Sequence, residues 1–171
     1  MRGLQIFPAL AIAALATPAL AQDAPMLPAP EQLVMQGADR FFAALKSADK
    51  TRLAREMIGD GTIFVHNRMD PDNPRVDVVK VSDHLERWAG DTAEVSEFME
   101  YQTVLVDGDM AQVWGPYTFF VDNKISHCGV NSLSMVRTDD GWKVANTSFS
   151  MVPPEECEAI GAPSTLKDIV E

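Results

Sequence analysis

The sequence predicts an α+β fold, with about three N-terminal helices packed on a curved antiparallel sheet of four long strands plus one short strand. Three observations lead to this prediction. Apolar residues recur at helical spacing early in the chain, whereas residues 95–151 show the pattern of strands. Turn residues divide that region at Asp107-Gly108, Asp122-Asn123-Lys124 and Asp139-Asp140-Gly141, each a hairpin signal. Helices followed by a run of strands are typical of α+β domains.

The helical part is predicted from apolar spacing and from residues that start and stop helices. Residues 31–48 carry an apolar stripe at Leu33, Ala38, Phe41, Phe42 and Leu45, as in an amphipathic helix that packs on a larger body. A second, short helix follows Asp49 as its cap, and a third follows Ser82 and ends at Gly90. Between them we expect a short strand at residues 62–66 and a loop at residues 67–74.

The N-terminus predicts export. Residues 1–21 are typical of a secretory signal, because an apolar segment from Leu4 to Leu20 follows Arg2 and closes on the small-x-small pattern Ala19-Leu20-Ala21. A membrane anchor is the alternative, but two prolines interrupt the segment and no basic cluster follows it. We therefore expect a periplasmic or secreted protein, cleaved after Ala21 and not inserted in a membrane afterwards.

The length after cleavage suits one domain with a single core. Residues 22–30 are rich in Pro and Ala and are expected to be a disordered leader. Residues 31–152 are expected to form the domain, and residues 153–171 a C-terminal tail. The formal net charge of −11 argues against nucleic acid or an anionic membrane as partner, and solubility is its simplest explanation.

The chain has two cysteines, Cys128 and Cys157. In an oxidising compartment an even count favours a disulfide. Such a bridge would tie the tail to the sheet and would stabilise the fold by about 3 to 4 kcal/mol through restriction of the unfolded chain. Two buried free thiols, or one reactive thiol, are the alternatives.

Several segments together resemble a known superfamily. They are the helix-first layout, the strand Ala111–Trp114 after Asp107-Gly108, the run Ser126–Val130 and the closing segment Gly141–Val144. They resemble the nuclear transport factor 2-like (NTF2-like) superfamily, in its SnoaL-like or lumazine-binding-like branch, over roughly residues 31–151. The resemblance implies a cystatin-like cone with one cavity, used in that superfamily by isomerases, dehydratases, cyclases and proteins with no activity.

Alternation along the strands predicts which side chains face that cavity. A three-residue loop at 122–124 would pair Val121 with Ile125 and Phe119 with His127, which gathers the apolar residues on one face. A two-residue turn at Asp107-Gly108 would place Glu100 opposite Gly115. Glycines in these strands leave room for a ligand, or they only bend the sheet. The predicted ligand-binding residues are Val113, Tyr117, His127, Asn131, Leu133, Trp142, Asn146 and Ser148.

The predicted catalytic candidates are His127, Glu100 and Tyr117. An imidazole can exchange a proton near neutral pH, although a lone histidine is more often a core residue, bonded here to Tyr117 or to a backbone carbonyl. Glu100, if it faces inward, would be a desolvated carboxylate of raised pKa that assists His127 or acts as the base itself. Tyr117, Asn131 and Asn146 could donate hydrogen bonds to a carbonyl or enolate oxygen.

The sequence lacks the motifs typical of metal binding, phosphate binding and serine hydrolysis. The histidines show no metal-ligand spacing, and no Gly-rich phosphate loop or Gly-x-Ser-x-Gly elbow is present, so we expect no metal and no cofactor. The leading hypothesis is an exported module that binds a small apolar or aromatic molecule without catalysis. A cofactor-independent isomerase, dehydratase or cyclase follows, and then a homodimer through the open face of the sheet, with Trp114 and Phe120 at the interface.

Overall fold

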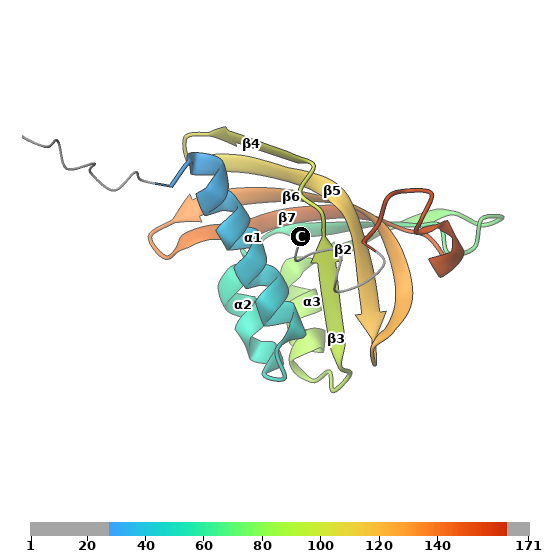
Figure 1. Ribbon diagram of the computed structural model, residues 1–171. Coiled ribbons are helices and arrows are strands. Elements are labelled where there is room, and N and C mark those ends of the chain that lie inside the picture. The colour runs from blue at the N-terminus through green and yellow to red at the C-terminus, as the bar shows by residue number, and fades with distance from the viewer. Residues whose placement is uncertain (1–27, 164–171) are drawn as a thin grey trace, which may run out of the picture.

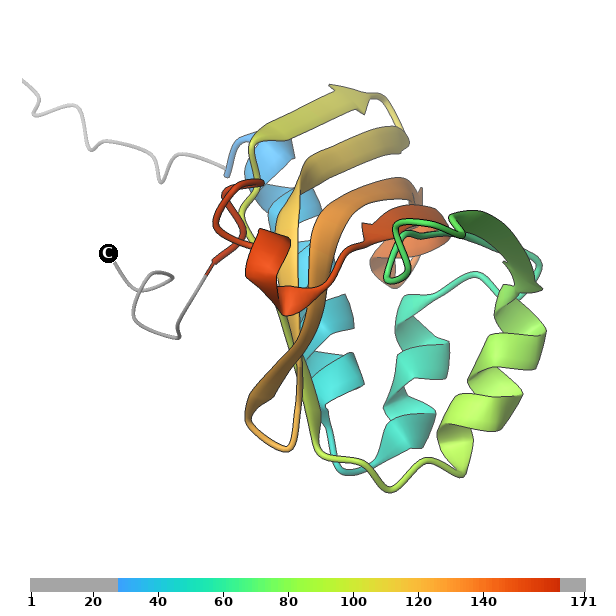
Figure 2. The same cartoon turned by 90° about the vertical axis from the view of Figure 1, so that its right-hand side faces the viewer.

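The computed structural model describes residues 28–163 and shows helices on one side of a strongly curved sheet (Figures 1 and 2). The predicted signal peptide, most of the leader and the end of the tail lie outside these residues. Within the described range, no helix has both the length and the apolar composition needed to cross a membrane. The α+β class and the curved sheet are confirmed. The elements, in chain order, are α1 (Pro30–Lys46), η1 (Lys50–Arg52), α2 (Leu53–Glu56), β1 (Thr62–Asn67), β2 (Arg75–Lys80), α3 (Val81–Ala89), β3 (Val95–Met99), β4 (Thr103–Asp107), β5 (Met110–Val121), β6 (Lys124–Thr138), β7 (Gly141–Met151) and η2 (Pro154–Glu156).

The sheet has seven strands in the described residues, in the order β2-β1-β7-β6-β5-β3, with β4 also paired to β5. It is mixed rather than antiparallel, because β1 runs parallel to β7. Strand β2, which returns antiparallel to β1 immediately before α3, is not among the predicted elements. The first of the four long strands that were predicted is divided into two short strands, β3 and β4. The three long strands are therefore β5, β6 and β7.

Of the two predicted helix caps, one is present in the structure and one is not. Asp49 does cap a helix, because its carboxylate accepts a hydrogen bond from the Thr51 amide at 3.2 Å, but the helix it starts is the 3-10 turn η1. The cap predicted at Ser82 is wrong, since α3 already begins at Val81 and the Ser82 hydroxyl donates to Asp83 instead. Strand β2 leads into α3 without a loop, so no residue is free to cap it.

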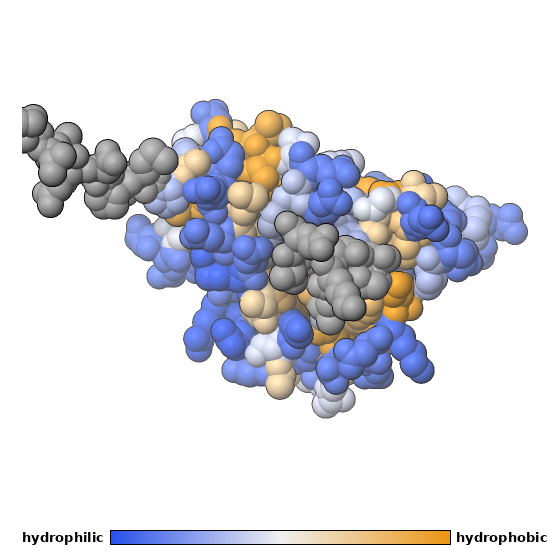
Figure 3. Space-filling view, in the orientation of Figure 1, coloured by the Kyte–Doolittle hydropathy of each residue, from blue (hydrophilic) through white to orange (hydrophobic). Residues whose placement is uncertain are grey.

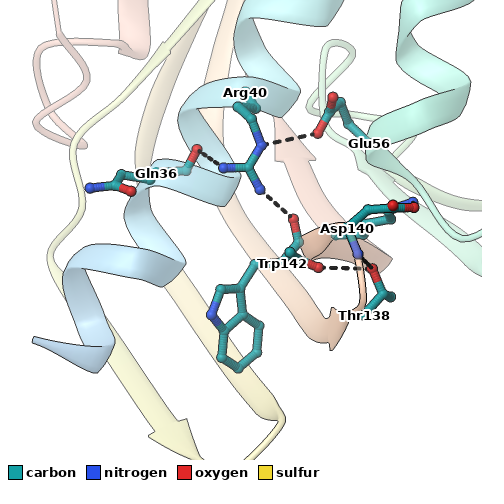
Figure 4. Close-up of polar contacts among 8 residues, drawn as sticks. Gln36, Arg40, Glu56, Thr138, Asp140 and Trp142 are labelled. Atoms are coloured by element: carbon teal, nitrogen blue, oxygen red, sulfur yellow. Dashed lines mark hydrogen bonds and ion pairs between the residues drawn. The ribbon is translucent and has the colours of Figure 1, made fainter. Parts of the chain in front are cut away.

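Helix α1 covers the concave face of the sheet and supplies much of the core. Its buried face, opposite a charged outer face, carries Val34, Ala38, Phe41, Phe42, Ala44 and Leu45. Arg40 ties this helix to its neighbours (Figure 4): it donates to the Trp142 carbonyl at 3.1 Å and pairs with the Glu56 carboxylate at 3.5 Å. One guanidinium therefore joins α1, the end of α2 and the start of β7.

The opposite face of the sheet is covered only in part. A second small cluster forms there, where Cys128 and Cys157 are joined by the predicted disulfide, with their Cα atoms 5.6 Å apart. On the face seen in Figure 3 hydrophilic side chains predominate, with an apolar group near the β4 end of the sheet. Leu105 and Met110, which are 62% and 60% exposed, lie at that end.

Two of the one-residue irregularities in the sheet, one at the edge beside β5 and one in the interior strand β7, decide which of the predicted side chains enter the cone. At residues 100–102 the edge gains one residue relative to β5: Met99 pairs with Tyr117, whereas Thr103 pairs with Trp114. In β7 the residue Ala145 is extra, because the pairing shifts between Ser134 and Met135. A one-residue shift turns every following side chain to the other face.

Glycines make both irregularities fit. A Cβ at Gly115 would overlap the Glu100 carbonyl oxygen, and a Cβ at Gly61 would overlap the Ala145 carbonyl oxygen. In each case a carbonyl of the irregular segment occupies the space that a side chain would fill, at Gly115 in β5 and at Gly61 just before β1.

Replacing Gly115 with alanine should therefore destabilise the fold, at the upper end of the roughly 1–3 kcal/mol typical of overpacking, because the clash is with backbone that cannot move cheaply. Urea unfolding followed by circular dichroism measures this. Gly59→Ala is the matched control, since nothing lies within 4 Å of its added Cβ, and should stay within about 0.5 kcal/mol of the parent. Equal stability of the two variants would contradict the packing of the Glu100 carbonyl on Gly115.

Candidate functional site

A cavity of about 220 Å³ lies between the helices and the concave face of the sheet. Apolar and aromatic side chains make most of its wall, and six polar side chains interrupt it. The wall consists of Phe41, Leu45, Met57, Ile63, Val65, Val79, His84, Trp88, Glu97, Tyr117, Phe119, His127, Asn131, Leu133, Thr147, Phe149 and Met151. A mostly apolar cavity with a few polar groups is the usual character of a small-molecule site.

Glu97, on edge strand β3, is the only acid that the described part of the chain contributes to this wall. Its carboxyl is enclosed by protein, and one oxygen, Oε1, accepts a hydrogen bond of 2.6 Å from the amide nitrogen of Asn131. Burial raises the pKa of Glu97 to about 7, against the opposing effect of the Asn131 hydrogen bond. The carboxyl therefore changes charge near neutral pH, with one oxygen held and the other without a hydrogen-bond partner among the described residues.

His127 stands on β6 as part of an aromatic wall. Its ring stacks on Phe119, with centroids 4.9 Å apart and planes 18° apart, and meets Tyr117 edge-on at 5.8 Å. Burial lowers the pKa of His127 to about 4, so the imidazole is neutral at physiological pH. Its Nδ1 lies 3.3 Å from the Ser126 hydroxyl. No hydrogen bond joins His127 to a carboxylate within residues 28–163, so the acid-assisted histidine is not formed.

Tyr117 is fully buried, and its hydroxyl already donates to the Ser150 carbonyl at 2.8 Å. Burial, followed by the nearby Glu97 carboxyl, raises its pKa. Tyr117 therefore contributes its ring to the cavity wall, while its hydroxyl proton is used in the hydrogen bond to the backbone. Its predicted role as a proton donor has no support from this geometry.

Helix α3 closes the cavity with His84 and Trp88, whose rings stack at 5.6 Å. Burial, and then the charge of Arg87, lowers the pKa of His84. The indole nitrogen of Trp88 is buried and has no partner in the part of the chain described. Lys50 places its ammonium over the same indole ring at 4.9 Å from the centroid, a cation–π contact that helps to hold Trp88 in place.

The structure brings four of the predicted ligand-binding residues together in the cavity wall: Tyr117, His127, Asn131 and Leu133. Their faces follow from the β5–β6 register, which pairs Phe119 with His127 and Tyr117 with Gly129 as predicted. Only the pairing of Val121 with Ile125 is wrong. The turn there has two residues, Asp122 and Asn123, both at positive φ, so Val121 pairs with Lys124.

The catalytic role predicted for Glu100 requires that it face inward, and the structure places it outward. The turn between β4 and β5 is formed by Gly108 and Asp109, which shifts the predicted pairing by two residues and leaves the faces unchanged. The extra residue at 100–102 then reverses the faces beyond it. Glu100 is exposed, and Glu97 points into the cavity in its place.

Asn146 and Ser148 do not line the cavity either, because the extra residue Ala145 reverses the faces of β7. Asn146 accepts a hydrogen bond from the Thr62 amide at 2.8 Å, and Thr147 and Phe149 face the cavity instead. Val113 and Trp142 do face inward but are packed in the core beside α1, outside the cavity wall.

The residues that sequence reasoning missed include Glu97, His84 and Phe149. One signal for Glu97 was available, since Val95 and Met99 flank it at strand spacing and are both buried. An acid between two inward apolar positions indicates an inward acid. Among residues 28–163, no three His, Cys, Asp or Glu side chains converge as a metal site requires.

The fold and cavity define a class of protein, a helix-covered cone with one apolar pocket, and comparison with solved structures shows that this is the NTF2-like fold. An NTF2-like protein with a cystatin-like fold from Novosphingobium aromaticivorans has a TM-score of 0.54 at 16% identity, with 75% of this chain and 86% of that chain covered. A conserved protein of Planctomyces limnophilus has a TM-score of 0.57 at 14% identity, with 72% and 96% covered.

A third structure, an NTF2-like family protein of Streptomyces avermitilis proposed to be a dehydratase, has a TM-score of 0.56 at 20% identity, with 71% of this chain and 94% of that chain covered. Identities this low show the fold alone. No family model matches the sequence, and no curated protein matches it.

The raised pKa of Glu97 predicts a pH-dependent stability that Glu97→Gln should remove. Between pH 4.5 and 7 the unfolded carboxyl ionises while the folded one stays protonated, so the free energy of unfolding falls as pH rises. Relative to the glutamine variant, the parent should lose on the order of 2–3 kcal/mol between pH 4 and pH 8.

Urea unfolding of both proteins at both pH values measures this difference, and the titration of His127 cancels because the two proteins share it. Glu100→Gln is the matched control, since that carboxyl is exposed, and it should show almost no pH-dependent difference. A Glu97→Gln variant that follows the parent at both pH values would show that the carboxyl is not buried as described.

Proposed function

We propose that this chain is an exported NTF2-like protein that binds a small, uncharged, apolar or aromatic molecule in its cone. One observation carries the proposal: the cavity of about 220 Å³ is enclosed mostly by apolar and aromatic side chains. Well-packed cores leave few voids larger than a water molecule, so a space of this size is costly unless something occupies it.

The size and lining of the cavity indicate the class of ligand. An apolar cavity of about 150 Å³ is enough for benzene, so this one has room for one ring with substituents or for a small bicyclic molecule. Phe41, Phe119 and Phe149 offer ring faces and edges for stacking. With His127 neutral, no cation in the wall would balance an anionic ligand, and Glu97 would repel one above pH 7.

Two observations support export. The disulfide between Cys128 and Cys157 is typical of an oxidising compartment. The apolar N-terminal segment that ends in Ala19-Leu20-Ala21 is typical of a secretory signal. We propose that the ligand is therefore a molecule present outside the cytoplasm.

A second candidate function is proton transfer on the bound molecule, with Glu97 as the acid–base group. A buried carboxyl whose pKa lies near 7, with one oxygen held by Asn131 and the other without a hydrogen-bond partner, favours it. Glu97 would take a proton from a carbon beside a carbonyl. It would return that proton to another carbon in an isomerisation, or to a departing hydroxyl group in a dehydration, which would release water. The similar protein of Streptomyces avermitilis, proposed to be a dehydratase, fits this class of reaction.

The binding proposal predicts that filling the cavity removes the response to ligand. A neutral aromatic probe such as indole, at about 100 times its Kd, should stabilise the parent by about 2.7 kcal/mol. Leu133→Trp should lose this effect, because Leu133 lies in the cavity wall. Thermal unfolding with and without indole measures it. Leu105→Trp, the same change at an exposed position, should keep the full response. An equal response in both variants would place indole elsewhere and contradict the proposal.

The catalytic proposal predicts hydrogen exchange on a bound ketone. Proton NMR in deuterated water would follow loss of the signals beside the carbonyl of cyclohexanone, a small neutral probe. The rate should rise with pH through about 7 as Glu97 ionises. It should fall by about 100-fold or more in Glu97→Gln. Glu100→Gln, with its exposed carboxyl, should leave the rate unchanged. Binding of the probe without exchange above the buffer rate would exclude catalysis and leave the binding function alone.

A further inference from the structure

The open face of the sheet carries a second hollow, distinct from the cavity. It has a volume of about 480 Å³ and lies on the side of the sheet away from the helices. We call it the open-face groove. Strands β1, β5, β6 and β7 form its floor, and its lining consists of His66, Arg68, Trp114, Val130, Ser132, Ser148, Phe149 and Ser150.

The floor of the groove is a row of hydroxyl groups across neighbouring strands. Ser132 and Ser148 are direct partners in the β6–β7 ladder, and Trp114 is the partner of Ser132 on β5. On β1, His66 places its Nε2 atom 3.1 Å from the Ser148 hydroxyl. Hydroxyl and imidazole groups both donate and accept hydrogen bonds, so this row suits a ligand with several hydroxyl groups.

Trp114 forms one wall with a broad apolar surface. It is 48% exposed, although tryptophan normally buries most of its area in a packed domain. A flat, half-exposed indole beside a polar floor offers one apolar face for the C–H side of a ring.

Arg68 gives the groove its charge. Its guanidinium forms no ion pair or side-chain hydrogen bond within residues 28–163, and no acid lines the groove. Asp70, two residues further on, accepts a hydrogen bond from the Asp72 amide inside its own loop. In a chain of net charge −11, a free guanidinium in an acid-free hollow favours a carboxylate, which it can bind through two parallel hydrogen bonds.

We propose that the open-face groove binds a small hydroxylated carboxylate of the sugar-acid class. Its ring lies on Trp114, its hydroxyl groups meet the Ser132, Ser148 and His66 row, and its carboxylate meets Arg68. The groove takes a polar anion, whereas the cavity suits an uncharged apolar molecule, so the two sites do not compete for one ligand.

The test is calorimetric titration of the folded protein at pH 7.5 and low ionic strength, with D-glucuronate as the probe and D-glucose and benzoate as comparison ligands. Glucuronate should bind about tenfold or more tightly than glucose, because only it can use Arg68. Arg68→Gln should remove that preference, and Trp114→Ala should weaken both sugars. Arg137→Gln is the matched control: this exposed arginine is paired with Asp109 away from the groove, and its loss should change nothing.

Several outcomes would overturn the proposal. Equal affinities for glucuronate and glucose, or an unchanged preference in Arg68→Gln, would remove the role of the carboxylate. Benzoate binding as tightly as glucuronate would remove the sugar. A dimer in light scattering that Trp114→Ala converts to monomer, without glucuronate binding in either protein, would assign the face to a second copy of the chain. Glu97→Gln should bind glucuronate as the parent does, and a loss there would instead place the probe in the cavity.

Discussion

The position of the Glu100 carbonyl oxygen over Gly115 is the contact on which the site depends. It allows the sheet edge to hold one extra residue between β3 and β4, and so reverses the faces of β3 relative to β4. Val104 and Val106 face the core on one side of this irregularity, and Val95, Glu97 and Met99 face it on the other. Without the extra residue Glu97 would point to solvent and the cavity would have no acid.

The carboxyl that this geometry buries has no cationic partner among residues 28–163 to balance it. Asn131 supplies one neutral hydrogen bond, and burial outweighs it, so the folded protein favours the protonated acid up to about pH 7. Folding alone does not need such a group, since a leucine or glutamine at the same place would be less costly at neutral pH. A destabilising group held in a cavity by a specific partner is more often explained by a role in binding or chemistry than by packing.

The sequence predicts what depends on periodicity and turn chemistry. The apolar stripe of α1 and the β5–β6 register follow from residues that are local in the chain, and both are confirmed over most of their length. The cavity residues on those elements, Tyr117, His127, Asn131 and Leu133, are therefore placed correctly. The class of fold follows in the same way.

The errors about which side chains face the cavity have one physical cause. The extra residues near Glu100 and at Ala145 depend on contacts with Gly115 in β5 and with Gly61 just before β1, so alternation along a single strand cannot show them. Each extra residue reverses the faces of the strand beyond it. At the edge beside β5 this places Glu97 inward and Glu100 outward. In β7 it places Thr147 and Phe149 inward, and Asn146 and Ser148 outward. Strand β2 was also missed, although Val76, Val78 and Val79 are β-branched residues that favour a strand; pairing with β1 sets its place in the sheet.

The disulfide and the C-terminal tail support the cavity from the opposite face of the sheet. Thr118 and Cys128 are partners across β5 and β6 on the open face, and both are fully buried under the tail. Cys157 bonds to Cys128, and the Thr118 hydroxyl donates to the Pro163 carbonyl at 2.6 Å. The neighbours of these two residues along the strands, Tyr117, Phe119 and His127, form the aromatic wall on the inner face. Successive residues of a strand point to opposite faces of the sheet, so the tail that packs on the outer face also holds the backbone that carries this wall. The disulfide between the two cysteines thereby helps to maintain the shape of the cavity.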